Sequence, residues 1–241
     1  MADIMQLCNI DQYASLIRDI RVHGVVAHPK IKAAIGELQE LDRLQALNSD
    51  LRTNAEFQRC FVRFFKVRRN AQWQAKFFDR LTTALLAKNS SFEWLLAEVL
   101  ATTGKVEASF VSKGITRIDR CQPTVDGNVL GVMKKFFPEM PWSLLRTGSP
   151  SAKTRRAIAV HSALGRVTHN LLATTEWADL EKEFDRVHGQ SGLTAAKKLD
   201  LLLWTYGSGK STRASKRHAP TMERASMKAG ELLRGSQPAM R

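Results

Sequence analysis

The chain has 241 residues, of which 44% are hydrophobic, a size that suits one globular domain or two small lobes sharing a core. Its 37 Lys and Arg outnumber 23 Asp and Glu, for a formal net charge of +14. This charge favours nucleic acid as partner, then an anionic membrane surface, although a basic tail on an ordinary enzyme would also produce it. Three widely separated cysteines, Cys8, Cys60 and Cys121, argue against a disulfide framework, a zinc site or an iron–sulfur cluster.

The N-terminal segment has acidic residues where a secretory signal would be basic and then apolar. No stretch approaches the roughly 20 apolar residues that a membrane span needs. We therefore expect a soluble cytoplasmic protein, nucleoid-associated if bacterial, that is monomeric, needs no cofactor or metal, and does not enter a membrane.

Helical spacing begins in the first half of the chain. Phe57, Phe61 and Phe64 recur at three- and four-residue steps, and the pattern continues from Trp73 to Leu85. The first set is surrounded by basic residues, for which a solvated face is the simplest interpretation: Arg59, Arg63, Lys66, Arg68 and Arg69.

Helix starts can be placed further along the chain. Ser90 and Glu93 have capping-box spacing, and Ser149 precedes Pro150 as an N-cap precedes the first helical position. Thr194 can cap the helix that follows it. No alternating run is long enough for a sheet, so the sequence predicts an all-α fold without internal repeats.

The C-terminal segment, residues 209–241, has eight Lys and Arg against two Glu and little apolar periodicity. It is predicted to be a flexible basic tail that adds nonspecific phosphate contacts. Just before and within it, "YGSGKST" resembles the end of a phosphate-binding loop. The full motif needs a glycine where Trp204 stands and a preceding strand, so this similarity does not predict a nucleotide site.

One segment combines a turn, a helix and an aspartate. After a helix ending near Leu100 come "TTGKV", a second helix "EASFVSKGITRI", and then "PTVDGNV", in which Asp126 starts a third helix. This segment resembles the helix-hairpin-helix base-excision DNA glycosylases, closest to the adenine glycosylase and endonuclease III branches. Their L-P-G-V-G hairpin is followed by a P-x-x-D motif, which the adenine branch continues as D-G-N-V. Gly104 falls on the first hairpin glycine when Asp126 falls on the catalytic aspartate.

The resemblance implies two helical lobes, a helix-hairpin-helix motif and a cleft between the lobes with Asp126 at its mouth. One lobe, residues 29–121, would be inserted between 1–28 and 122–208, and the helix of "KKLDLLLWTYG" would pack beside the aspartate. Gly104, Lys105 and Val106 would bind a DNA phosphate through the hairpin. Lys113 would contact DNA or be solvated.

Three departures from the family pattern bear on the mechanism. The second hairpin glycine is Val106, a β-branched residue unsuited to positive φ. Ala108 stands where bifunctional members carry a Schiff-base lysine, and no cysteine follows Cys121 to build the family's cluster. The resemblance thus implies a monofunctional enzyme.

The chemistry is consistent with this role. Breaking an N-glycosidic bond develops positive charge on the sugar, which a fixed carboxylate stabilises. A helix N-terminus favours the anionic form, so Asp126 is suited to be both an N-cap and the catalytic group. The sequence predicts a glycosylase that removes a damaged or modified base, flipped out of duplex DNA, in repair or in defence against foreign DNA. The alternatives are a noncatalytic helix-hairpin-helix DNA-binding protein and an RNA or membrane-surface binder driven by charge.

Overall fold

The computed structural model describes the backbone of residues 10–216 and the side chains of residues 10–209. The chain divides after Gly207 into two units, Met1–Gly207 and Ser208–Arg241. Within the described residues there are α-helices and one 3₁₀ helix but no strand. The all-α prediction is therefore confirmed.

The longest connections between helices lie before and after α7, at residues 116–126 and 137–149. The helix bounds are α1 Ile10–Val22, η2 Val25–Ala27, α2 Pro29–Leu47, α3 Ala55–Phe64, α4 Ala71–Leu86, α5 Phe92–Thr103, α6 Ala108–Ile115, α7 Gly127–Phe136, α8 Pro150–Leu172, α9 Thr175–His188 and α10 Ala195–Lys216.

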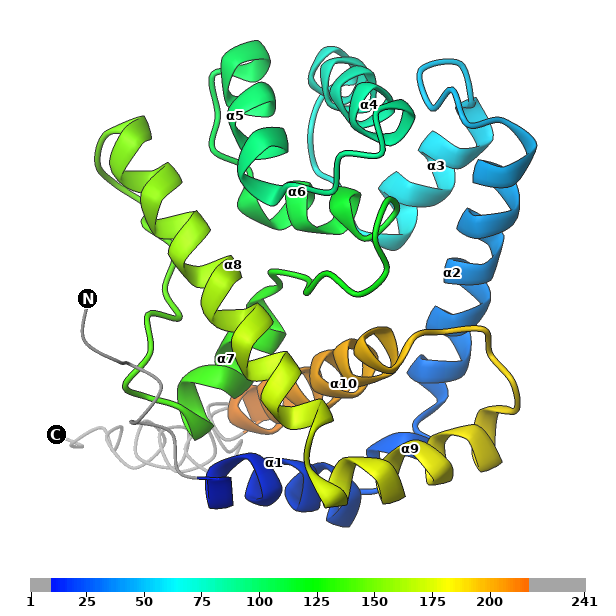
Figure 1. Cartoon of the computed structure of the whole chain (residues 1–241), viewed down its shortest axis with the longest axis vertical. Helices are drawn as coiled ribbons and strands as arrows, with labels where there is room; N and C mark the ends of the chain where they lie inside the picture. Colours follow the sequence, from blue (N-terminus) through cyan, green and yellow to red (C-terminus); the bar gives the residue numbers. More distant parts are fainter. Residues whose placement is uncertain (1–9, 217–241) are drawn as a thin grey trace, which may run out of the picture. The chain divides into compact units, whose positions relative to one another are not determined.

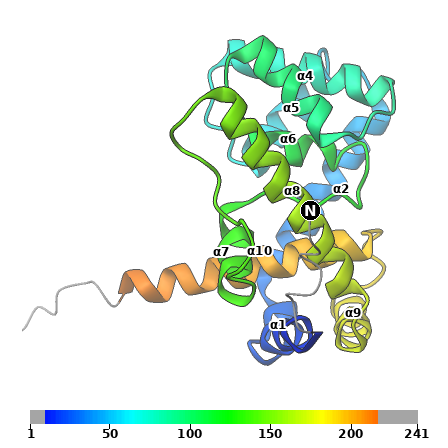
Figure 2. The ribbon, with the colours of Figure 1, turned by 60° about the vertical axis from the view of Figure 1, so that its left-hand side comes forward.

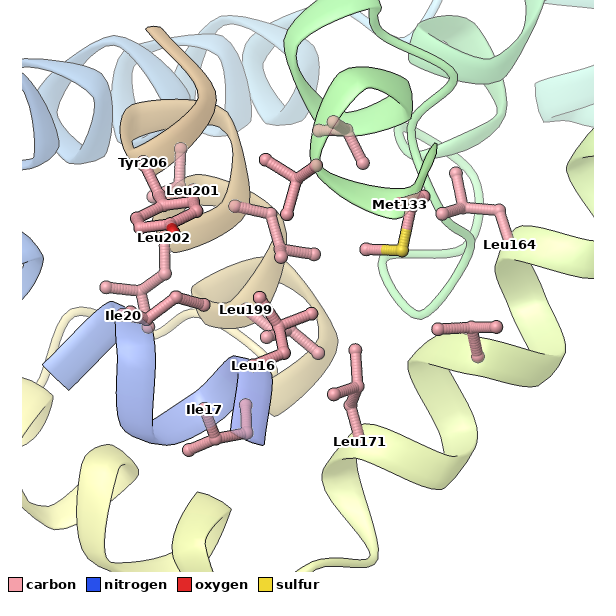
Figure 3. Close-up of a cluster of buried hydrophobic side chains, with 14 of the residues drawn as sticks. Leu16, Ile17, Ile20, Met133, Leu164, Leu171, Leu199, Leu201, Leu202 and Tyr206 are labelled. Carbon is pink, nitrogen blue, oxygen red and sulfur yellow. The ribbon is translucent and has the colours of Figure 1, made fainter. Parts of the chain in front are cut away.

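Buried apolar side chains form two clusters. The first collects α1, the start of α2, α7, most of α8, α9 and α10. Figure 3 shows part of it, where Leu16 and Ile20 of α1 meet Leu199 and Leu202 of α10. The second collects the end of α2 with α3, α4, α5 and α6, and it contains most of the predicted phenylalanine stripe. Each cluster buries the apolar faces of amphipathic helices.

Two long helices contribute to both clusters (Figure 1). In α2, Leu38 belongs to the first cluster and Leu41 to the second; in α8, Ala157 belongs to the second and Val160 to the first. The change from one cluster to the other thus falls inside α2, after Leu38, and the predicted lobe of residues 29–121 stays a prediction.

The capping predictions have two outcomes. Ser149 accepts a hydrogen bond from the Ala152 N–H at 3.2 Å, and Thr194 accepts one from the Lys197 N–H at 3.3 Å, as expected. For α5 the prediction was wrong by one residue, because the cap is Ser91, which accepts from the Trp94 N–H at 3.2 Å. Phe92 is then the first helical residue, and its side chain is buried in the second cluster, which sets where the helix begins.

Helix α6 is short and almost fully enclosed. Residues 111–117 are all buried, Lys113 and Arg117 included. A Cβ on Gly114 would lie 3.2 Å from side-chain atoms of Leu81 and Phe77, so α6 packs closely on α4. Eight residues make a marginal helix in isolation, and packing supplies the missing stability.

Helix α10 includes "YGSGKST", so the segment that resembles a phosphate-binding loop is helical. The first residues of the predicted tail, 209–216, continue this helix; residues 217–241, to which the rest of that prediction applies, lie outside the described part of the chain. Among the described helices, none has the length and apolar character required to cross a membrane.

Candidate active site at the start of α7

Asp126 caps α7 and is held by two groups. Its Oδ1 accepts a hydrogen bond from the Asn128 N–H at 2.9 Å, which confirms the predicted N-cap. Its Oδ2 lies 3.3 Å from Lys113 Nζ, and the carboxylate side chain remains 21% exposed while the lysine side chain is 9% exposed. The carboxylate is therefore fixed in position and still reachable from solvent.

Lys113 projects from the last turn of α6 and lies beside two aromatic rings. Its Nζ lies 5.6 Å from the Phe65 ring centroid and 5.8 Å from that of Phe110, distances at which a cation is attracted to a ring face. The sequence allowed two interpretations of Lys113, a DNA contact or a solvated surface lysine. Its side chain is buried, which excludes a solvated surface lysine. Contact with DNA remains a prediction for this residue, and the structure adds a partner that spacing did not indicate, Asp126.

Three buried polar side chains from three helices hold the loop before Asp126. Ser112 Oγ on α6 accepts a hydrogen bond from the Val125 N–H at 2.9 Å. On α10, Lys197 Nζ donates to Thr124 Oγ1 at 3.1 Å and pairs with Asp200 at 2.8 Å. These contacts fix the backbone on the side of Asp126 away from α7.

The third side chain is His161 of α8, which donates to the Pro123 carbonyl. Its ring stacks on Phe92, with 4.0 Å between centroids and 3° between planes. Burial lowers the pKa of His161 from 6.5 to about 4, so it is a neutral donor near neutral pH. Sequence spacing gave no indication of these three side chains, because they lie 11, 38 and 74 residues from Pro123 and on separate helices.

The turn between α5 and α6 contains the predicted hairpin residues. Gly104 adopts a left-handed conformation, φ 70°, as the C-cap of α5. Val106 is not among the described residues with positive φ, so the turn does not strain this β-branched side chain. The Lys105 N–H is used within the turn by Thr103 Oγ1 at 3.3 Å, whereas the N–H groups of Val106 and Glu107 face no acceptor among the described residues.

Helix α6 links the turn to the aspartate. The turn lies before its first residue, Ala108, and the pair Lys113–Asp126 lies at its other end. Ala108 is buried, so the position at which the family carries its lysine offers no amine here. Three of the cavities in the described part of the chain are lined by other residues than Asp126, and the predicted cleft remains a prediction.

The described residues include no group of three or more His, Cys, Asp or Glu that could hold a metal ion. Comparisons with protein-family models, with curated proteins and with solved structures found no match to this chain. The function is therefore argued from the site. Chemically, the arrangement offers one fixed, partly exposed carboxylate next to a buried ammonium group and two aromatic rings.

Proposed function

We propose that this protein is a monofunctional DNA glycosylase that hydrolyses the N-glycosidic bond of a damaged or modified base flipped out of duplex DNA. The observation that supports it most is Asp126 itself. Its carboxylate is bound by a helix N–H and by Lys113, yet keeps an exposed edge. A residue needed only as a cap would not require a buried lysine partner.

The proposed reaction uses this fixed negative charge. As the bond between C1′ and the base nitrogen breaks, its electron pair leaves with the base, which takes up a proton from solvent. The positive charge that develops on the sugar is stabilised by the Asp126 carboxylate. A water oxygen then bonds to C1′, and the proton that this water loses is accepted by Asp126.

Lys113 would serve in this scheme as a positioning residue. Its ammonium group fixes one carboxylate oxygen, and Ser112, one residue earlier on α6, fixes the loop behind it. A carboxylate that is already held in its reactive position does not have to reorient during the reaction, and this preorganisation is the main source of electrostatic catalysis.

The test is a thermodynamic and kinetic cycle of Asp126→Asn and Lys113→Met. Asp126→Asn keeps a capping oxygen but leaves the buried ammonium unpaired, so stability should fall by about 3 kcal/mol. Base release in single turnover should fall about a hundredfold or more. The double variant removes both charges, so it should recover stability without recovering base release. Melting temperature and excision from duplexes with different modified bases are measured on each protein.

Ser149→Ala is the matched control, because it removes a helix cap without changing charge. It should cost about 1 kcal/mol and leave excision unchanged at temperatures where the protein is folded. If the Asp126→Asn variant excises bases at the wild-type rate, Asp126 is only a helix cap.

The expected product is an intact abasic strand. A covalent adduct trapped by borohydride would contradict the monofunctional mechanism and implicate Lys113 or Lys105. DNA binding without release of any base would favour the noncatalytic alternative.

A further inference from the structure

A basic cavity of about 340 Å³ lies between the start of α4 and the turn after α5. Its lining residues are mostly polar and include no carboxylate: Arg68, Arg69, Asn70, Gln72, Trp73, Lys76, Thr103 and Lys105. The basic residues come from the loop before α4, from α4 itself and from the turn at Gly104. Separate segments of the chain thus contribute positively charged side chains to one cavity.

Three of these cations are not neutralised by the protein. Arg68, Lys76 and Lys105 are exposed, and none of them pairs with a carboxylate among the described residues. Arg69 differs, because it pairs with Glu107 at 2.7 Å and stays beside the cavity as a fixed group. The three positive charges at this cavity repel one another, and a bound anion would offset that repulsion.

Two further features favour an anion. The cavity adjoins the N-terminus of α4, where the N–H groups of Ala71 and Gln72 have no acceptor among the described residues. The positive end of a helix of 16 residues attracts negative charge there. Trp73 also lines the cavity and is 7% exposed, and its buried indole N–H has no hydrogen-bond partner in the described part of the chain. Buried donors are rarely left unpaired in proteins.

The cavity is connected to the candidate active site through one aromatic ring. The guanidinium carbon of Arg69 lies 5.8 Å from the Phe110 centroid, and Lys113 Nζ lies at the same distance from it. Lys113 in turn pairs with Asp126. Phe110 is therefore in contact both with Arg69, which lines the cavity, and with the lysine that pairs with Asp126.

We propose that this cavity binds a backbone phosphate of the DNA strand that carries the excised base, an inference that rests on the proposed function. Arg68 and Lys76 provide contacts outside the predicted hairpin, and Lys105 joins them from the turn. The contact is independent of base sequence, so it positions the strand and does not select the base.

The test compares Arg68→Ala/Lys76→Ala with the control Lys182→Ala/Arg186→Ala, which removes the same charge from exposed positions on α9. Duplex DNA affinity is measured over a series of salt concentrations. In the cavity variant it should fall about tenfold at low salt, and the log–log slope should shrink by about 1, as expected for one lost phosphate contact. The control should match wild type.

The outcomes separate this inference from the proposed function. If the cavity variant and the control have the same affinity and slope while wild type binds and excises, the phosphate lies elsewhere and the glycosylase proposal stands. If wild type binds DNA but releases no base, a reduced slope in the cavity variant still supports the cavity. If wild type does not bind duplex DNA, both proposals are overturned.

Discussion

Three buried side chains fix the polypeptide around Asp126, two of them as cations and one as a neutral ring. Lys113 is a cation paired with the aspartate itself. Lys197 is a cation whose charge is balanced by Asp200 while it donates to Thr124. His161 donates to the Pro123 carbonyl from a neutral ring. Buried polar groups of this kind are stable only when partnered, so each contact restricts the loop to one position.

The histidine makes stability depend on pH. Its pKa in the folded protein, about 4, lies below its ordinary value of 6.5, so between these values the unfolded chain binds more protons. The contribution is therefore fully present above pH 6.5 and is lost as the pH falls toward 4. At about 1.4 kcal/mol per unit, we expect a loss of up to ~3 kcal/mol from this residue.

Urea unfolding of wild type and His161→Gln at pH 7 and at pH 4.5 measures this effect. The variant lacks the titrating ring, so its free energy of unfolding should fall less between the two pH values, although it starts from a lower value because the stack on Phe92 is lost. Equal pH dependence of the two proteins would show that His161 is not the group responsible.

Among the helices, the packing of α10 against α7 determines where the candidate site is. A Cβ on Gly207 would lie 2.5 Å from the Asn128 carbonyl oxygen and 2.9 Å from its carbon, both backbone atoms. Asn128 is the residue whose N–H binds Asp126. The absent side chain at Gly207 therefore lets α10 approach the first turn of α7 (Figure 2).

Gly207→Ala should force these helices apart. Overpacking of this kind costs about 1–3 kcal/mol, and the displaced Asn128 should lower the rate of base release as well. Gly131→Ala, on α7 with no atom within 4 Å of the added Cβ, is the matched control and should raise stability by about 0.5–1 kcal/mol. Thermal unfolding and single-turnover excision on both variants check this, and an unchanged melting temperature for Gly207→Ala would contradict the close contact.

Element boundaries show how far local signals reach. Ser149 and Thr194 were placed correctly because a capping side chain acts on the next three residues, which the sequence displays. Ser90 was placed wrongly as the cap of α5. Ser91 is an equally suitable capping residue, and the burial of Phe92 makes Ser91 the cap. For α6 the predicted helix ran to Ile118, three residues beyond its end at Ile115, because its apolar face continues past the point where the helix stops.

For the whole molecule, the net charge of +14 should dominate association with DNA. Affinity for duplex DNA should fall with salt at a log–log slope of roughly −0.9 for each phosphate neutralised. Deleting residues 217–241, which contain five Lys and Arg against two Glu, should flatten the slope and leave excision at saturating DNA unchanged.

A full-length variant with Arg217, Arg224, Lys228 and Arg234 changed to Gln provides the control, because it alters charge without altering length. It should reproduce the flatter slope. A steep slope in this variant would assign the salt dependence to the described helices, and a slope near zero in wild type would remove the nucleic-acid proposal.

The sequence by itself determined the all-helical class, the starts of α8 and α10 and the N-cap at Asp126, because apolar spacing and capping act within one or two turns. It also identified "PTVDGNV" at the distance from Gly104 that suggests a glycosylase. Only the tertiary structure decided that Lys113 pairs with Asp126 and that Arg68, Lys76 and Lys105 surround one cavity. Lys113 and Asp126 lie 13 positions apart, and the three cavity residues lie 8 to 37 positions apart on different segments, so no local periodicity relates them. Their meeting depends on how α4, α6 and α7 pack, since packing of apolar faces sets the distances between polar groups that those faces carry.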